Sequence, residues 1–174
     1  MSAPEATEAL LTLYPRLIES LEACAGGPFV AGVLLDGLLV GWGANTVLRD
    51  HDVTRHAEMN ALGEAGRRTG RVHLDGAQLV TSHFPCLMCY HAAKWARIRE
   101  VAYLFDYAET ELIFGFHGDS RMLEDLAIGT KALERDGSIA LTRLVDPKLH
   151  ALYRLELPRR WRASYRDRCM GYDV

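Results

Sequence analysis

The sequence lacks any long apolar run, any strong excess of one charge and any low-complexity stretch. Its 174 residues carry a net charge of −3, and 49% of them are hydrophobic. A transmembrane helix is not expected, because such a helix needs about 20 consecutive apolar residues. The small net charge gives no general attraction to nucleic acid or to an anionic membrane. We therefore expect a compact protein with no membrane partner, for which nucleic acid is a poor candidate partner.

Cysteine is scarce, and no targeting segment is recognisable. Only four cysteines are present, and two of them, Cys24 and Cys169, belong to no motif. We expect these two to be buried or free thiols, as in a reducing cytoplasm. Glu5 and Glu8 stand where a secretory signal peptide would be basic, so no leader is expected. No repeat or linker interrupts the chain, and its length predicts one domain over residues 1–174.

The most informative residues are a His-Ala-Glu triplet, His56 to Glu58, and a later Pro-Cys-x-x-Cys segment, Pro85 to Cys89. One imidazole and two thiolates suit zinc. A catalytic zinc site has three protein ligands and an open position, whereas a structural site is closed by four. His56, Cys86 and Cys89 can therefore hold Zn²⁺, and Glu58 is left over to move protons. Pro85 predicts that the cysteines begin a helix, where the helix dipole stabilises thiolates.

Two further interpretations of these residues stay open. Cys86 and Cys89 alone are also typical of a redox pair or of half a structural zinc site. A closed structural site needs a fourth ligand, and the nearest candidates are His83 and His91. Such a site would make the chain a non-enzymatic, zinc-stabilised binding module. The full set favours the catalytic interpretation, since H-x-E followed by P-C-x-x-C is the signature of zinc-dependent nucleobase deaminases.

The pattern of apolar residues predicts alternating strands and helices. Strands are expected over residues 29–35, 38–42, 77–81, 100–105 and 139–144. Helices are expected over residues 5–24, from about residue 56 onward, and over 86–97, 119–135 and 147–157. Asp36-Gly37, between the first two strands, is a two-residue hairpin signal. Strands separated by helices favour a mixed sheet that is covered on both faces.

The chain resembles the cytidine deaminase-like superfamily, and within it the guanine and cytosine deaminase branch. The zinc motif carries the superfamily resemblance. The branch resemblance rests on four short stretches: Gly27-Pro28-Phe29, Asp52 to Glu58, Trp95-Ala96-Arg97-Ile98 and Gly115-Phe116. It implies an α/β fold, a three-layer α/β/α sandwich around a central mixed five-stranded sheet. It also implies a homodimer that removes ammonia from a small amino-heterocycle.

The resemblance implies roles for residues outside the metal site. Asn45 would hydrogen-bond the base, and Phe29 and Trp95 would lie near it. Taken as bare sequence, Asn45 is typical of a turn, and the two aromatic residues are typical of a core. Asp119 lies near the position of a second acidic proton shuttle, although it could instead cap a helix.

Two departures from the branch concern the substrate. Phe84 stands immediately before the Pro-Cys pair, where the branch often has Glu, and it would make the base pocket more apolar. The Arg-rich tail, about residues 158–174, is either a solvated helix end or a segment that docks on a partner subunit, where Tyr172 would cap the pocket. Arginine beside aromatic residues is also typical of nucleic-acid binding, which keeps a tRNA adenosine deaminase open as a second class of enzyme.

The resemblance therefore predicts a zinc-dependent hydrolytic deaminase of a free nucleobase, with guanine as the first choice of substrate and cytosine as the second. A nucleoside, a nucleotide or a triazine such as ammeline stays open, because the sequence does not fix the size of the base pocket. A tRNA adenosine deaminase and a zinc-stabilised binding module stay open as well.

Overall fold

The structure is a computed structural model that describes residues 3–116 and 138–167. Its centre is a five-stranded sheet with the strand order β2-β1-β3-β4-β5. The strands are β1 (Val30–Leu35), β2 (Leu38–Ala44), β3 (Gln78–His83), β4 (Glu100–Phe105) and β5 (Ala140–Arg143). β1 pairs antiparallel with β2 and with β3, whereas β3, β4 and β5 run parallel. The sheet is therefore mixed, as predicted.

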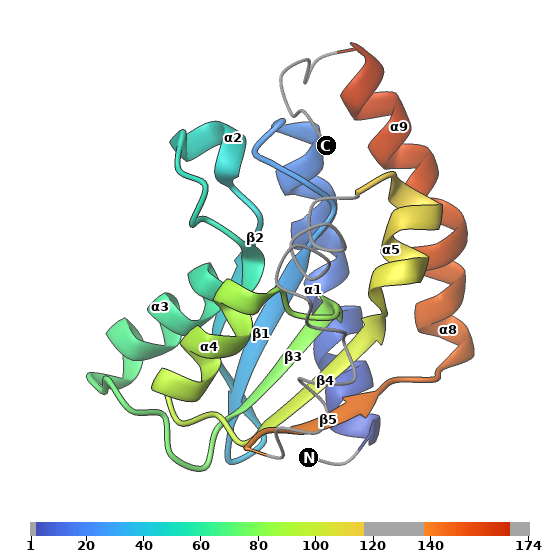
Figure 1. Cartoon of the computed structure of the whole chain (residues 1–174). Coiled ribbons are helices and arrows are strands. Elements are labelled where there is room, and N and C mark those ends of the chain that lie inside the picture. Colours follow the sequence, from blue (N-terminus) through green and yellow to red (C-terminus); the bar gives the residue numbers. More distant parts are fainter. Residues whose placement is uncertain (1–2, 117–137, 168–174) are drawn as a thin grey trace.

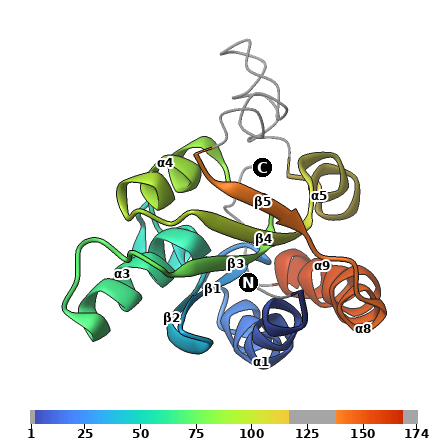
Figure 2. The same ribbon diagram turned by 90° about the horizontal axis from the view of Figure 1, so that it is seen from below.

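Helices cover both faces of the sheet (Figure 1). They are α1 (Ala3–Glu22), α2 (Val47–Asp50), α3 (Ala57–Thr69), α4 (Leu87–Trp95), α5 (Tyr107–Phe114), α8 (Pro147–Leu149), the π-helix η1 (His150–Glu156) and α9 (Leu157–Asp167). Figure 2 shows α1, α8 and α9 on one face of the sheet and α3 and α4 on the other. The predicted three-layer α/β/α sandwich with a five-stranded mixed sheet is confirmed.

Two apolar clusters fill the space between the layers. One joins α1 and the C-terminal helices to the sheet, and includes Leu10, Leu13, Leu17, Tyr153 and Trp161. The other lies beneath α3 and α4, and includes Ala61, Leu79, Tyr90, Ala93 and Val101. β3 and β4 contribute to both clusters, which explains the near-continuous apolar sequence of β4. Burial thus fixes β3, the strand that leads directly to the Pro-Cys pair.

The contact between α3 and β2 is close because two glycines of β2 face the helix. A Cβ atom on Gly41 would lie 2.4 Å from the Ala65 nitrogen, and one on Gly43 would lie 2.7 Å from the Ala57 carbonyl oxygen. Any larger side chain at either position would push the helix away. Gly43 therefore sets the position of the first turn of α3, which directly follows His56, and Gly41 sets that of the turns after it.

Some elements differ from the expectation. α5 was not predicted, and it begins with a capping box in which Asp106 and Glu109 each accept the other's backbone N–H. The last helical region continues through a π-helix to Asp167, beyond the predicted end at residue 157. The helix predicted over residues 119–135 lies outside the described residues. The Asp36-Gly37 hairpin is confirmed, with positive φ angles of 51° and 75° at the two turn residues.

Cys24 is disulfide-bonded, so the expectation of a free thiol at this position is wrong. Disulfides persist in oxidising surroundings, and the thiol argument for a reducing compartment therefore loses its support. Cys169 lies outside the described residues. Within the described ranges, each helix is too short or too polar to cross a membrane.

Candidate metal centre and base site

The three predicted zinc ligands converge at the N-termini of two helices. His56 is the N-cap residue of α3, and Cys86 is the N-cap residue of α4. His56 Nδ1 lies 3.5 Å from Cys86 Sγ and 3.7 Å from Cys89 Sγ. All three ligand atoms lie within 4.8 Å of one another. This spacing suits one shared ion, since zinc lies about 2.3 Å from sulfur and about 2.0 Å from nitrogen.

The charge states of the cysteines also fit a cation. A hydrogen bond with Cys89 holds the pKa of the Cys86 thiol well below its usual range, and His56 acts in the same direction. The same hydrogen bond, together with burial, raises the pKa of Cys89. The two cysteines thus share a proton that a bound cation would displace. The donor set of one imidazole and two thiolates therefore fits Zn²⁺.

Within the described residues, this cluster offers three ligand atoms and no fourth. His91, one candidate for a fourth ligand, is exposed, and its Nδ1 lies 2.8 Å from the Leu87 carbonyl oxygen. His83, the second candidate, has its Nδ1 2.8 Å from Ser82 Oγ. Three protein ligands leave one coordination position for water, which is the catalytic rather than the structural arrangement.

Glu58 is buried in the first turn of α3, beside the metal cluster. Its Oε1 accepts a hydrogen bond of 3.1 Å from Thr81 Oγ1 on β3. Burial, with a smaller contribution from Cys86, raises the pKa of Glu58 to about 7. Thr81 was not among the predicted site residues, although a hydroxyl in a buried strand needs a hydrogen-bond partner. Thr81 orients the carboxylate that we expect to move protons.

Asn45 and Phe29, two of the predicted base-contacting residues, are joined through the backbone. The Asn45 N–H donates to the Phe29 carbonyl oxygen over 3.0 Å. The Asn45 Oδ1 accepts from the backbone N–H groups of Gly27, at 3.3 Å, and Val47, at 3.2 Å. These contacts fix the orientation of the Asn45 amide. Its contact with a base stays a prediction.

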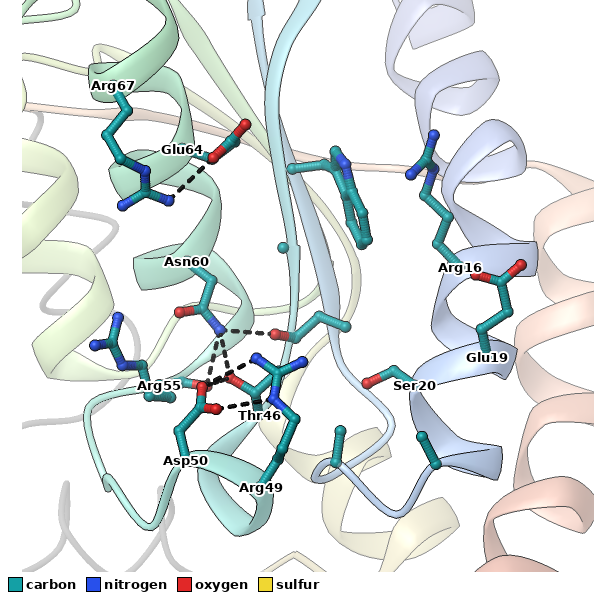
Figure 3. A pocket seen from close by; sticks show the side chains of 15 residues that line it. Arg16, Glu19, Ser20, Thr46, Arg49, Asp50, Arg55, Asn60, Glu64 and Arg67 are labelled. Atoms are coloured by element: carbon teal, nitrogen blue, oxygen red, sulfur yellow. Dashed lines mark hydrogen bonds and ion pairs between the residues drawn. The ribbon is translucent and has the colours of Figure 1, made fainter.

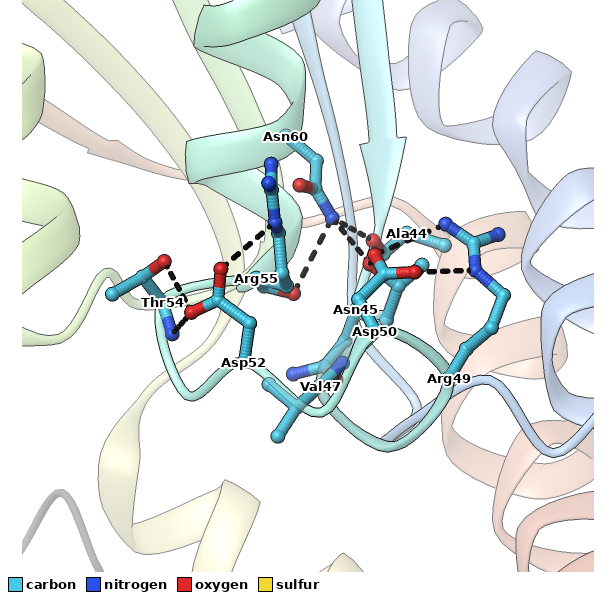
Figure 4. A network of polar contacts seen from close by, with 10 residues as sticks. Ala44, Asn45, Val47, Arg49, Asp50, Asp52, Thr54, Arg55 and Asn60 are labelled. Atoms are coloured by element: carbon cyan, nitrogen blue, oxygen red, sulfur yellow. Dashed lines mark hydrogen bonds and ion pairs between the residues drawn. The ribbon is translucent and has the colours of Figure 1, made fainter.

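A polar network holds the loop between β2 and α3 in place (Figure 4). The Asp52 carboxylate accepts from the Thr54 N–H and hydroxyl, at 2.8 and 2.6 Å, and pairs with Arg55 at 3.1 Å. The Asn60 Nδ2 donates to three oxygens, those of Ala44, Thr46 and Arg55. Because His56 directly follows Arg55, this network positions the first metal ligand.

The remaining predicted site residues lie elsewhere or are not described. The Phe84 ring is buried and packs against two tyrosine rings, those of Tyr103 at 4.9 Å and Tyr107 at 5.2 Å. Trp95 ends α4, at the opposite end from the cysteines, and is 81% exposed. Contacts of these two side chains with a substrate stay predictions. Two predicted residues lie outside the described part of the chain: Asp119 and Tyr172.

A separate hollow of about 580 Å³ runs along the edge strand β2, between α1 and α3 (Figure 3). The Arg16 guanidinium there lies 4.5 Å from the centre of the Trp42 ring. Two more arginines in the hollow pair with acids, as Arg49–Asp50 and Arg67–Glu64. The predicted ligands and Glu58 are not among its lining residues. The hollow is therefore distinct from the metal centre.

Comparison with known proteins identifies the family. Residues 4–105 match the cytidine and deoxycytidylate deaminase zinc-binding region. This stretch contains the three clustered ligands and Glu58. The chain therefore belongs to this family of zinc-dependent deaminases.

Two relatives show where the sequence similarity lies. The chain is 38% identical to the guanine deaminase of Bacillus subtilis (strain 168) over 91 residues, which cover 52% of this chain and 58% of that protein. It is 36% identical to the tRNA-specific adenosine deaminase of Aquifex aeolicus (strain VF5) over 76 residues, which cover 44% of this chain and 50% of that protein. The similarity thus spans roughly half the length of these two relatives.

Solved structures extend the similarity to most of the chain. The guanine deaminase from Nitrosomonas europaea matches with a TM-score of 0.67 and 29% identity, covering 94% of this chain and 86% of that one. A variant of the protein NE0047 in complex with 8-azaguanine matches with a TM-score of 0.65 and 26% identity, covering 85% of this chain and 81% of that one.

Proposed function

We propose that the chain is a zinc-dependent hydrolytic deaminase of a free nucleobase, and that its substrate is guanine. The observation that carries the proposal is the three-ligand cluster with the buried Glu58 beside it. Similarity to guanine deaminases supports the choice of substrate. The reaction would convert guanine and water into xanthine and ammonia.

The chemistry divides between the metal and the carboxylate. Zinc, when bound, lowers the pKa of water to about 7 and so supplies a nucleophile at neutral pH. Glu58 takes a proton from the water and passes it to a ring nitrogen of the base as the water oxygen adds to the amino-bearing carbon. Glu58 then delivers the second water proton to the amino group. The carbon–nitrogen bond breaks, ammonia leaves, and the oxygen remains on the ring as a carbonyl.

The base would be held by residues beside the metal cluster. Asn45 would hydrogen-bond the base, and Phe29 would pack against it, as the family resemblance implies. We further propose that residues 1–174 form one deaminase domain, that the enzyme is a homodimer, and that it acts in the cytoplasm. The homodimer rests on the same resemblance and the single domain on the length of the chain, whereas the location is a sequence-based expectation that the Cys24 disulfide does not support.

A tRNA substrate also has direct support. The similarity to a tRNA-specific adenosine deaminase is comparable in identity to that of the guanine deaminase, although it covers less of the chain. The basic residues of the tail, about 158–174, would then contact phosphates. Cytosine, a nucleoside or nucleotide, and a triazine such as ammeline are further candidate substrates, and a zinc-stabilised module would act on none of them.

The test is ammonia release by the zinc-loaded protein on a panel of guanine, cytosine, adenine, their nucleosides, ammeline and a tRNA. We expect release from guanine and little from the nucleosides. Release from tRNA alone, with salt-sensitive binding, would replace guanine by tRNA as the substrate. Zinc bound stoichiometrically with no release from any member of the panel would contradict the proposed function.

A further inference from the structure

His83 is a buried histidine that the proposed chemistry does not use. It ends β3, and only 3% of its surface is exposed. Its Nε2 atom has no hydrogen-bond partner among the described residues. A buried polar atom without a partner costs stability, so a purely structural role would be filled better by an apolar ring. The histidine therefore calls for a reason beyond packing.

The second ring nitrogen of His83 is anchored by the neighbouring serine. The Ser82 hydroxyl accepts from the Val30 N–H over 3.1 Å, so its own proton is available for His83 Nδ1, which lies 2.8 Å away. Ser82 is completely buried. One hydroxyl thus ties the start of β1 to the imidazole at the end of β3.

The imidazole in turn packs against Phe29. The two ring centres lie 4.6 Å apart with an angle of 71° between the ring planes, which is the favourable edge-to-face arrangement. The rings of Phe105, at 5.2 Å, and Phe114, at 5.1 Å, enclose His83 further. The contacts with Ser82, Phe105 and Phe114 therefore hold the His83 ring in place independently of Phe29.

The position of Phe29 in turn affects that of Asn45, because the Phe29 carbonyl oxygen accepts the Asn45 N–H. The ring of Phe29 also packs edge-to-face on Phe116, at 4.8 Å. The two residues that would hold the base are thus positioned from one side by a single imidazole.

We propose that His83 is a positioning residue of the base site: fixed by Ser82, its imidazole sets the place of the Phe29 ring and, through the Phe29 carbonyl, the place of Asn45. This inference rests on the proposed function, since it concerns the same base site. It assigns to His83 an effect on base binding and none on the metal or on proton transfer. The contacts that define its place are those with Ser82 and with the rings of Phe29, Phe105 and Phe114.

The experiment compares four zinc-loaded full-length proteins: wild type, His83→Ala, His83→Phe and Leu79→Ala. Leu79→Ala is the matched control, because Leu79 is a fully buried residue of the same strand in the second apolar cluster. Four quantities are measured for each protein: zinc content, kcat for guanine, KM for guanine, and amide hydrogen exchange at Asn45 and Gly27. The exchange measurement needs no substrate, so it tests the positioning role separately from the proposed function.

We expect His83→Ala to keep its zinc, to raise KM about tenfold or more with a much smaller change in kcat, and to exchange both amides faster. His83→Phe keeps a ring against Phe29 but loses the hydrogen bond with Ser82, so it should recover only part of the loss. Leu79→Ala should lose stability while its KM and both amides stay close to wild type. An unchanged KM and unchanged exchange in His83→Ala, or equal effects in Leu79→Ala, would overturn the proposal. If the wild type does not act on guanine, the amide exchange rates alone test the positioning role of His83.

Discussion

At the residue scale, the metal centre depends on side chains whose protons are placed by close neighbours. Cys86 and Cys89 share one proton, His56 turns Nδ1 toward both sulfur atoms, and Glu58 is oriented by the Thr81 hydroxyl. Most of these contacts join residues that are far apart in the sequence. The ligand types are local information, whereas the proton positions arise only when α3, α4 and β3 meet.

Cys86→Ala should abolish stoichiometric zinc binding, because two ligands remain where catalytic zinc needs three. Zinc content after dialysis, measured by atomic spectroscopy, checks this. His91→Ala is the control and should keep its zinc, since the His91 ring is exposed and bonded to its own helix. Full zinc in the first variant, or zinc loss in the second, would show that the ligand set is wrong.

His83 makes the free energy of unfolding depend on pH. Burial lowers the pKa of the folded His83 to about 3, from an ordinary value of 6.5. Between these values the unfolded chain binds the extra proton, so stability is present above pH 6.5 and is lost as the pH falls. We expect His83→Phe to lower the slope of unfolding free energy against pH by about 1.4 kcal/mol per pH unit between about pH 6 and 4. Parallel slopes for the two proteins, measured by urea denaturation, would contradict this.

At the element scale, the position of α3 on β2 decides where His56 and Glu58 lie. The helix approaches the strand over two glycines, and a polar network fixes the loop that leads into it. The Gly43 contact and the loop network both act on the first turn of α3. The geometry of the metal centre is therefore set largely by contacts outside it.

Gly43→Ala should destabilise the protein by about 1–3 kcal/mol and weaken zinc binding, because the added methyl group meets the first turn of α3. Gly63→Ala is the matched control. Gly63 lies in the same helix, and its added Cβ would meet only the flexible end of Arg67, at 3.4 Å. It should raise stability by about 0.5–1 kcal/mol with unchanged zinc affinity. Chemical denaturation and zinc competition measure both, and equal behaviour of the two variants would refute the close-contact argument.

The helices and turns also show which elements the sequence pattern could predict. The hairpin at Asp36-Gly37 and the helix starts near His56 and Cys86 were predictable, because turn residues, Pro85 and the spacing of apolar residues are local information. α5 was missed because its apolar residues have no helical period, although the Asp106–Glu109 capping box could have revealed it. Residues 147–157 were predicted as a helix, but their pattern did not distinguish a π-helix from an α-helix. Tyr153 of this segment donates to the Leu10 carbonyl oxygen of α1, a contact between distant elements that a local pattern does not record.

At the scale of the whole molecule, the sheet order brings the site together. β1 lies between β2 and β3, so the loop after β2 and the segment after β3 reach the same region. The zinc ligands could be predicted, because a short motif records them. The surroundings of Phe84, Trp95 and His83 could not, because they depend on how the sheet twists and on which face each side chain enters.

The most direct test of the central claim is guanine conversion by zinc-loaded wild type and zinc-loaded Glu58→Ala, with ammonia and zinc measured in the same samples. We expect equal zinc in both proteins, ammonia release by the wild type, and a loss of about 10²–10⁴ in kcat for the variant. Ammonia release by Glu58→Ala at a rate near that of the wild type would contradict the proton-transfer role of Glu58, and zinc-loaded wild type without any release from guanine would contradict the assigned substrate.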